Sequence, residues 1–281
     1  MSMDSANRIK ALIKLLETGQ GQYTPLLKEE LARAVRTNPD EVARVMTEEG
    51  NSSAPQTILR ALEEICWEDL TAQFAAWSAK INPELEEGLA LLAKFTAPTA
   101  TLADLTHSVD ELALALRPAV LNANDVREIV RACSHYIFTA RKFAVLPSVT
   151  DIRDLAFPHF LRTGKGSALC MACLYHTLGA RYGLDTEILD VAGRILLAVK
   201  DEARNDAFIV DMENDGKILP RENCKDYAIA RGMAWRESLL TPLSSRDVVR
   251  RFIANMIFML RKLHDERPLV YLRGYLDTLA R

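Results

Sequence analysis

The stretch of residues 157–192 constrains the fold of this chain most, because it places a glycine-containing turn, a cysteine-bearing apolar helix and a β-rich segment in direct succession. Gly164 and Gly166 free the backbone before the helix, and the Ser167 hydroxyl can accept a hydrogen bond from one of the first helical amides. Gly183 then allows the helix to end. We therefore expect a helix packed against a small antiparallel sheet.

The segments after this helix favour β-strands, since aliphatic runs alternate there with turn residues. Asn214, Asp215 and Gly216 are typical of a tight turn between two strands. The expected strands cover residues 186–191, 194–199, 208–211 and 217–219.

Most of the remaining chain has apolar residues at helical spacing. Pro118 is expected to end one helix, because proline lacks the donor for the next hydrogen bond, and Ser245 is expected to cap another. The expected helices cover residues 8–17, 24–35, 39–47, 55–77, 83–95, 105–116, 124–143, 222–231 and 245–263, and a last one begins at Pro268.

The order of these elements predicts a mostly helical α+β protein with three parts. They are a helical N-terminal region (1–148), a core with the small antiparallel sheet (149–220) and a C-terminal helical hairpin (221–281). A single helical pair is short of the ~3 repeats that a stacked solenoid needs, so the hairpin is expected to pack on the core.

Composition excludes several classes of protein. With 281 residues, 49% of them hydrophobic, the chain can bury a large core without disulfide bonds. A net charge of −3 gives no basic surface for nucleic acid or an anionic membrane. Five cysteines without regular spacing favour reduced thiols, and neither a signal peptide nor a run of ~20 apolar residues is present. We expect a cytoplasmic protein with no nucleic-acid or membrane partner.

Five segments occur in an order and spacing typical of one family. They are INPELEEGLALLAKF (81–95), RTGKGSALCMACLYHTLGARYGL (162–184), VAGRILLAV (191–199), FIVDMENDGKIL (208–219) and RDVVRRFIANMIFMLRKL (246–263). They resemble the transglutaminase-like superfamily, and within it the bacterial SirB-type proteins with a helical N-terminal region and a tetratricopeptide-like tail. The resemblance implies a cysteine-protease-like core in residues 149–220.

The same resemblance implies where a Cys-His-Asp triad would lie. The nucleophile position holds Ala168, the histidine position holds Arg194, and only Asp211 keeps its residue type. An arginine cannot act as a general base, since its guanidinium stays protonated at any working pH. The core is therefore expected to be a degenerate, non-catalytic version of the family fold.

Cys170 supports an alternative function. It falls in the first turn of the expected helix, where the helix dipole lowers the pKa of a thiol and can make it a nucleophile. His159 precedes the helix and could fold back toward this thiol as its base, with Asp211 orienting the base. The alternative is therefore a thiol-dependent acyl-transfer or hydrolytic enzyme that uses Cys170, His159 and Asp211.

Cys170, Cys173 and His176 have a spacing that suggests a metal site. At ~100° per helical residue, however, Cys170 and His176 lie roughly 120° apart, so one metal ion cannot easily reach all three side chains. Buried thiols are also common in protein cores. We expect neither a metal nor a cofactor.

Arg194 has two possible roles. The simpler one is an ion pair with Asp211 that fills the former triad space. The functional one is a site for a small anion, such as a carboxylate or phosphate, formed by Lys165, the amides of Gly166 and Ser167, and Arg194 at the helix N-terminus.

These observations predict a non-catalytic binding or regulatory protein that retains a cysteine-protease-like scaffold. A protein or peptide is the expected partner, and a small anionic ligand is a further possibility. The thiol enzyme remains the alternative.

Overall fold

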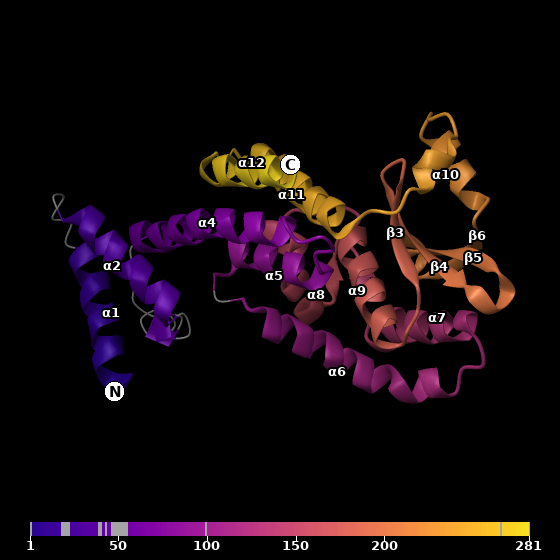
Figure 1. Ribbon diagram of the computed structural model, residues 1–281, viewed down its shortest axis with the longest axis horizontal. Helices are drawn as coiled ribbons and strands as arrows, with labels where there is room; N and C mark the ends of the chain where they lie inside the picture. The colour runs from indigo at the N-terminus through magenta and orange to yellow at the C-terminus, as the bar shows by residue number, and fades with distance from the viewer. Residues whose placement is uncertain are drawn as a thin grey trace.

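The structure, a computed structural model, describes residues 2–17, 23–38, 41–42, 44–45, 56–98, 100–264 and 266–280. These residues form a mostly helical α+β fold, which confirms the expected class. The N-terminal helices lie at one end of the long axis and the four-stranded sheet lies at the other, with most of the remaining helices between them (Figure 1). Within these ranges, no helix is both long and apolar enough to cross a membrane.

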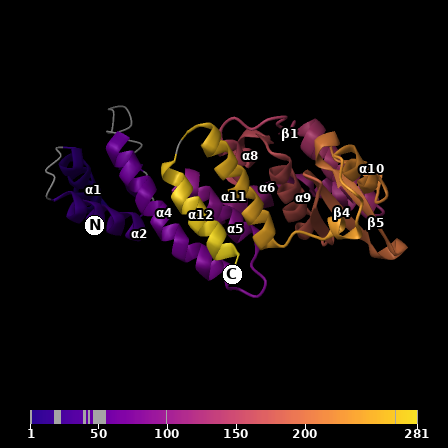
Figure 2. The same ribbon diagram turned by 90° about the horizontal axis from the view of Figure 1, so that it is seen from above.

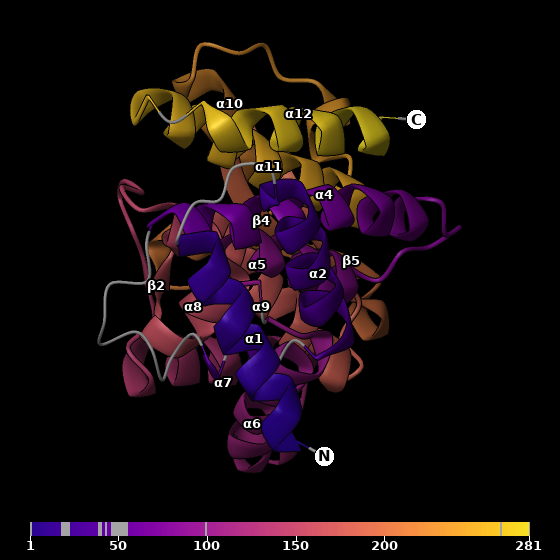
Figure 3. The same ribbon diagram turned by 90° about the vertical axis from the view of Figure 1, so that its left-hand side faces the viewer.

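The N-terminal end consists of α1 (Ser2–Glu17), α2 (Thr24–Thr37) and α4 (Gln56–Ser78), which contact one another (Figure 3). Apolar side chains of α1 and α2, together with Val42 and Val45, form a small core that is separate from the main one and includes Ile9, Ile13 and Leu31. Most of the buried side chains of α4 belong to the main core. The helix expected over residues 39–47 falls largely outside the described residues, which include only 41–42 and 44–45 of it.

The middle of the molecule contains α5 (Leu85–Thr96), α6 (Leu102–Leu121) and α7 (Val126–Ser134), the last continuing as the π-helix η1 (His135–Ala140). The prediction that Pro118 ends its helix is wrong, because α6 continues to Leu121. A proline removes one hydrogen bond to the preceding turn, and in the last turn of α6 the helix tolerates that loss.

The C-terminal hairpin consists of α11 (Ser245–Lys262) and α12 (Arg267–Leu279), and it lies along α4 and α5 (Figure 2). The buried Tyr275 hydroxyl donates to the carbonyl of Trp67 on α4. The cap of α11 is Ser244 and not Ser245 as predicted. Ser244 accepts the amide of Asp247 while the Asp247 carboxylate accepts the amide of Ser244, so two amides at the helix start are satisfied.

The second half of the chain is organised around α9 (Ala168–Arg181), which is buried over most of its length. The segment before it contains a short parallel strand pair, a 3-10 helix and one α-helix. These are β1 (Ala144–Val145), β2 (Lys165–Gly166), η2 (Ile152–Leu155) and α8 (Phe157–Thr163).

An antiparallel sheet follows α9, with its four strands in sequence order. It consists of β3 (Thr186–Val191), β4 (Arg194–Asp201), β5 (Asp206–Asp211) and β6 (Lys217–Pro220), with the 3-10 turns η3 (Glu202–Arg204) and η4 (Met212–Asn214) between strands. All four predicted strands are therefore confirmed, although β4 and β5 each extend two residues further into their shared hairpin.

The two faces of this sheet bury different groups of side chains, as the alternation of a strand requires. Ile195 and Leu197 face α9 and belong to the main core. Leu196 and Ile209 face the opposite side, which is covered by α10 (Asn223–Ala230) and η5 (Glu237–Leu240).

The turn before β6 contacts α7 and α9 through a short chain of hydrogen bonds. Gly216 has a φ of +69°, and a Cβ placed there would overlap the hydroxyls of Tyr175 and Ser134. The Tyr175 hydroxyl donates to Ser134 Oγ at 2.8 Å, and Ser134 donates to the Gly216 carbonyl at 3.1 Å. Only glycine fits here, because both its backbone angle and its lack of a side chain are required.

Candidate functional site

Cys170 lies in the first turn of α9, as the sequence predicts. Ser167 caps the helix, and its Oγ accepts the Cys170 amide at 3.2 Å. Gly166, directly before the cap, packs against the Phe160 ring, and a Cβ at this position would overlap that ring.

The thiol of Cys170 is inaccessible, however, which does not fit the exposed, acidic nucleophile that the alternative function needs. The residue is 0% exposed, and its Sγ lies 3.4 Å from Ser167 Oγ and 3.8 Å from the carbonyl oxygen of Asp154 in η2. Burial raises the pKa of Cys170 to about 11, and the hydrogen bonds from Ser167 only partly oppose this. Desolvation therefore outweighs the helix dipole here.

His159 lies on α8 and has other partners. Its Nδ1 is 3.1 Å from Arg162 Nη2, and its Nε2 is 3.7 Å from Asp154 Oδ1. Within the described residues, the hydrogen bonds of the Cys170 thiol go to Ser167 and Asp154 and none goes to an imidazole. The structure thus does not form the Cys170–His159 pair of the alternative function.

Arg194 and Asp211 form the expected ion pair. Arg194 Nη2 lies 2.9 Å and 2.7 Å from the two carboxylate oxygens of Asp211, which is itself 0% exposed. Tyr227 on α10 donates its hydroxyl to Asp211 at 2.7 Å, and its ring lies 4.5 Å from the guanidinium of Arg194. Asn214 adds a further hydrogen bond at 2.8 Å, so the carboxylate is held on several sides.

These contacts decide the charge state of Asp211. Burial alone would raise the pKa of this carboxyl, but hydrogen bonds from Arg194, Tyr227 and Asn214 outweigh burial and lower it. Arg194 Nε is buried without a hydrogen-bond partner in the described part of the chain, so the guanidinium is held by its two terminal nitrogens, Nη2 on Asp211 and Nη1 on Glu213.

The residues predicted to occupy the triad positions lie on different sides of the sheet. Asp211 pairs with Leu196 across the strands, and Arg194 lies two residues before Leu196, so both point with Leu196 toward α10. Ala168 and Cys170 belong to α9, which covers the other face. Strand alternation therefore separates the thiol from the ion pair.

The same separation divides the residues of the predicted anion site. Lys165, Gly166 and Ser167 lie directly before α9, whereas Arg194 faces α10 and is engaged by Asp211. The structure does not bring the four residues to one place.

The remaining polar side chains of α9 have structural partners. His176 Nδ1 lies 2.9 Å from Thr186 Oγ1 on β3, and burial lowers the pKa of His176. Cys173 is fully buried, which raises its pKa. Among the described residues, no group of three or more His, Cys, Asp or Glu side chains is placed to hold a metal ion.

Residues 103–254, more than half of the chain, match the sequence model of one protein family, the transglutaminase-like superfamily. The chain belongs to the transglutaminase-like superfamily. The match includes α9, the whole sheet and the Arg194–Asp211 pair. Comparisons with curated proteins and with solved structures found no match.

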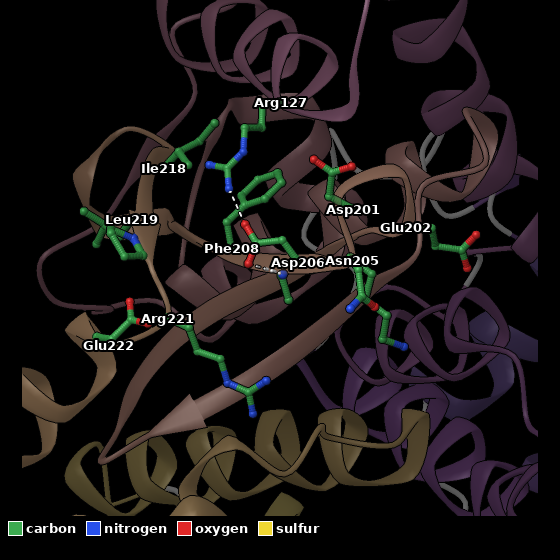
Figure 4. A pocket seen from close by; sticks show the side chains of 13 residues that line it. Arg127, Asp201, Glu202, Asn205, Asp206, Phe208, Ile218, Leu219, Arg221 and Glu222 are labelled. Carbon is green, nitrogen blue, oxygen red and sulfur yellow. Dashed lines mark hydrogen bonds and ion pairs between the residues drawn. The ribbon is translucent and has the colours of Figure 1, made fainter.

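The transglutaminase-like domain contains one further feature that the sequence does not indicate, a cavity of about 740 Å³ beside the end of β5 (Figure 4). We call it the β5 notch. It is lined by Arg127 of α7, residues 200–202 and 205–208 around the β4–β5 hairpin, and residues 218–222 at the end of β6.

Charged side chains surround the β5 notch. Arg127 Nη2 donates to Asp206 Oδ2 at 2.8 Å, and its guanidinium lies 4.4 Å from the centre of the Phe208 ring (Figure 4). Glu202 and Glu222 lie on opposite sides of the notch and have no ion pair among the described residues.

Proposed function

We propose that this transglutaminase-like protein is a non-catalytic binding or regulatory protein. The observation that carries the proposal is the burial of Cys170 against Ser167 and the Asp154 carbonyl, with no imidazole bonded to it. A nucleophilic thiol needs access to substrate and a nearby base, and this one has neither in the described structure.

The second support is the occupant of the histidine position. Arg194 Nη2 donates to both carboxylate oxygens of Asp211, on the far side of the sheet from Cys170. A permanently charged arginine cannot exchange protons during catalysis. Asp211, the residue that would orient a catalytic base, is thus used to neutralise the Arg194 guanidinium.

Several finer statements remain predictions that accompany this proposal. They are a protein or peptide partner, a small anionic ligand, the absence of nucleic-acid and membrane partners, a cytoplasmic location, and the three-part division at residues 148 and 220. The SirB-type relationship and the tetratricopeptide-like character of α11 and α12 are predictions of the same kind.

The reactivity of Cys170 tests the proposal. In the native protein at neutral pH, we expect iodoacetamide to label Cys170 at least about tenfold more slowly than in the urea-unfolded protein, because labelling requires opening of the structure around α9. Peptide mapping by mass spectrometry measures the labelling rate. Cys173, a buried cysteine on the same helix, is the reference for the labelling rate of a structural thiol.

An activity assay provides the second part of the test. Acyl transfer from glutamine peptides and hydrolysis of peptide and ester substrates should be the same in the wild type and in Cys170→Ala. Rapid labelling of native Cys170 below pH 8, together with a hydrolytic or acyl-transfer activity that Cys170→Ala abolishes, would establish the thiol enzyme and refute the proposal.

A further inference from the structure

A groove of about 420 Å³ lies between the second half of α6 and the end of α9. We call it the α6 groove. One wall consists of α6 residues between 110 and 121, and the other consists of Arg181 and Tyr182. The Tyr182 hydroxyl donates to the Ala113 carbonyl, so this side chain connects the two helices along the groove. The helix α6 lies along the lower edge of the molecule, where another protein can reach it (Figure 1).

Two leucines of α6 give the α6 groove an exposed apolar row. Leu114 is 68% exposed and Leu121 is 73% exposed, and both line the groove. Each helical residue turns by ~100°, so Leu121, seven positions later, returns to the face of Leu114 about 10 Å further along the helix. A single exposed leucine is ordinary on a protein surface, whereas two on one face beside a groove are typical of a contact site.

Arg117 supplies the unpaired charge of the α6 groove. Three charged residues line the groove, and two of them, Asp110 and Arg181, form an ion pair at 3.0 Å. The third, Arg117, is exposed and has no ion pair among the described residues. The lining charge that remains is therefore positive, which favours an acidic side chain on an occupant of the groove.

The walls of the α6 groove favour a helical occupant over an extended one. Both walls are helical, and the main-chain groups of a helix bond mainly within it, so the walls offer no ladder for an extended chain. A helical occupant satisfies its own main chain and can place an apolar row against the two leucines. The distance of about 10 Å between Leu114 and Leu121 along α6 equals about two turns of such a helix.

We propose that the α6 groove binds an amphipathic helix of a partner protein, whose apolar side chains cover Leu114 and Leu121 and whose acidic side chain pairs with Arg117. Burial of the two leucines supplies most of the affinity. The ion pair with Arg117 lies at an exposed position and mainly selects among partners. This inference rests on the proposed binding function and names its surface and the chemistry of its partner.

Fluorescence polarisation on the full chain tests the inference. The probe is a labelled, end-blocked peptide of about 16 residues, with leucine at helical spacing and glutamate beside it. One comparison peptide has lysine in place of glutamate, and a reordered peptide has the probe's composition without the helical spacing. We expect both to bind at least about fivefold more weakly than the probe. Because the chain has a net charge of −3, non-specific attraction would favour the lysine peptide instead.

A substitution in the apolar row identifies the surface. Leu114→Asp should weaken binding of the glutamate peptide at least about tenfold, because it removes an apolar contact and adds a like charge. Val270→Asp is the matched control, since Val270 is 69% exposed on α12, and unchanged binding is expected. Both positions are exposed, and circular dichroism verifies that both variants are folded.

Charge reversal tests the role of Arg117. Arg117→Glu should weaken binding of the glutamate peptide and tighten binding of the lysine peptide, each by about threefold, because a single exposed ion pair contributes little. A structural change alone would weaken both peptides, so the opposite signs report the ion pair.

Several results would overturn the inference. They are absence of binding of the glutamate peptide to the wild type, equal binding of the reordered peptide, equal effects of Leu114→Asp and Val270→Asp, and an unchanged peptide preference in Arg117→Glu. Dimerisation of the wild type that Leu114→Asp abolishes would also overturn it, because the groove would then bind a second copy. None of them alters the labelling rate of Cys170, so the proposed function and this inference can fail separately.

Discussion

The two faces of the four-stranded sheet bury opposite kinds of chemistry. The face toward α9 is apolar and includes the neutral, inaccessible thiol of Cys170 in its core. The face toward α10 contains a charged pair, with Asp211 fully buried and Arg194 18% exposed. The comparison shows that strand alternation separates the buried thiol of Cys170 from the Arg194–Asp211 ion pair, because the two lie on opposite faces of one sheet.

The largest loss of folding stability is expected when the Arg194–Asp211 ion pair, on the sheet face toward α10, is removed. Asp211→Ala leaves the Arg194 guanidinium buried without its main partner, and it should lower the free energy of unfolding by about 3–5 kcal/mol. Urea titration followed by circular dichroism measures the change. Because the pKa of Asp211 is lowered in the folded protein, the wild type should keep this contribution above about pH 4 and lose it as the pH falls further.

Glu213 provides the matched control for Asp211. Its carboxylate lies 3.3 Å from Arg194 Nη1 but is 38% exposed, so Glu213→Ala should cost about 0–1 kcal/mol. The double variant R194M/D211L should recover most of the loss, because an apolar pair of similar volume avoids the buried charge. Equal costs for Asp211→Ala and Glu213→Ala would contradict this description of the charged face.

A smaller change in folding stability is expected at alkaline pH from Cys170, on the sheet face toward α9. The pKa of Cys170 is raised from 9.0 to about 11 by burial, so the unfolded chain loses the thiol proton first and stability falls as the pH rises from about 9 toward 11. The cost of Cys170→Ala, measured by urea titration, should therefore be about 1.4 kcal/mol lower at pH 10 than at pH 8. Thr177→Ala, a buried and non-titrating change on the same helix, should have the same cost at both pH values. A pH-independent cost of Cys170→Ala would mean that the folded thiol ionises normally.

The smallest change in folding stability is expected from His176, which lies in the second half of α9. Burial lowers the pKa of His176, so the unfolded imidazole binds a proton before the folded one does, and stability should fall as the pH drops below about 6.5. His176→Gln should show a shallower decline between pH 7.5 and pH 5.5 in thermal or urea unfolding. Thr177→Ala, a non-titrating change next to His176 on the same helix, should leave the wild-type slope unchanged. An identical slope in all three proteins would exclude His176 as the cause.

Local patterns predicted most of the fold. The cap at Ser167, the helix after it and the turn at Gly216 follow from residues that act over a few positions, and all are present. The boundary errors at Pro118 and Ser244 also have local causes. When two serines are adjacent, as at 244 and 245, the sequence alone does not show which one caps the helix, because this depends on the backbone angles of the preceding turn.

The candidate site was harder to predict because it depends on tertiary contacts. The pairing of Arg194 with Asp211 followed from complementary charge on adjacent strands, and it is present. The burial of Cys170 did not follow, since it requires the Asp154 carbonyl in η2 to lie over the start of α9. The β5 notch depends on where β6 leaves its neighbour, and hydrogen-bond direction at Ala207 is visible only once the register is known.

The carboxylate of Asp206 also has a consequence for behaviour in concentrated solution. An uncovered strand edge is a template on which other chains can add, and β6 limits this hazard by being short and by carrying Lys217 and Pro220. Asp206 gives similar protection at the start of β5, where its Oδ1 accepts the amide of Ala207. Without this carboxylate, one more amide would be available to neighbouring molecules at high protein concentration.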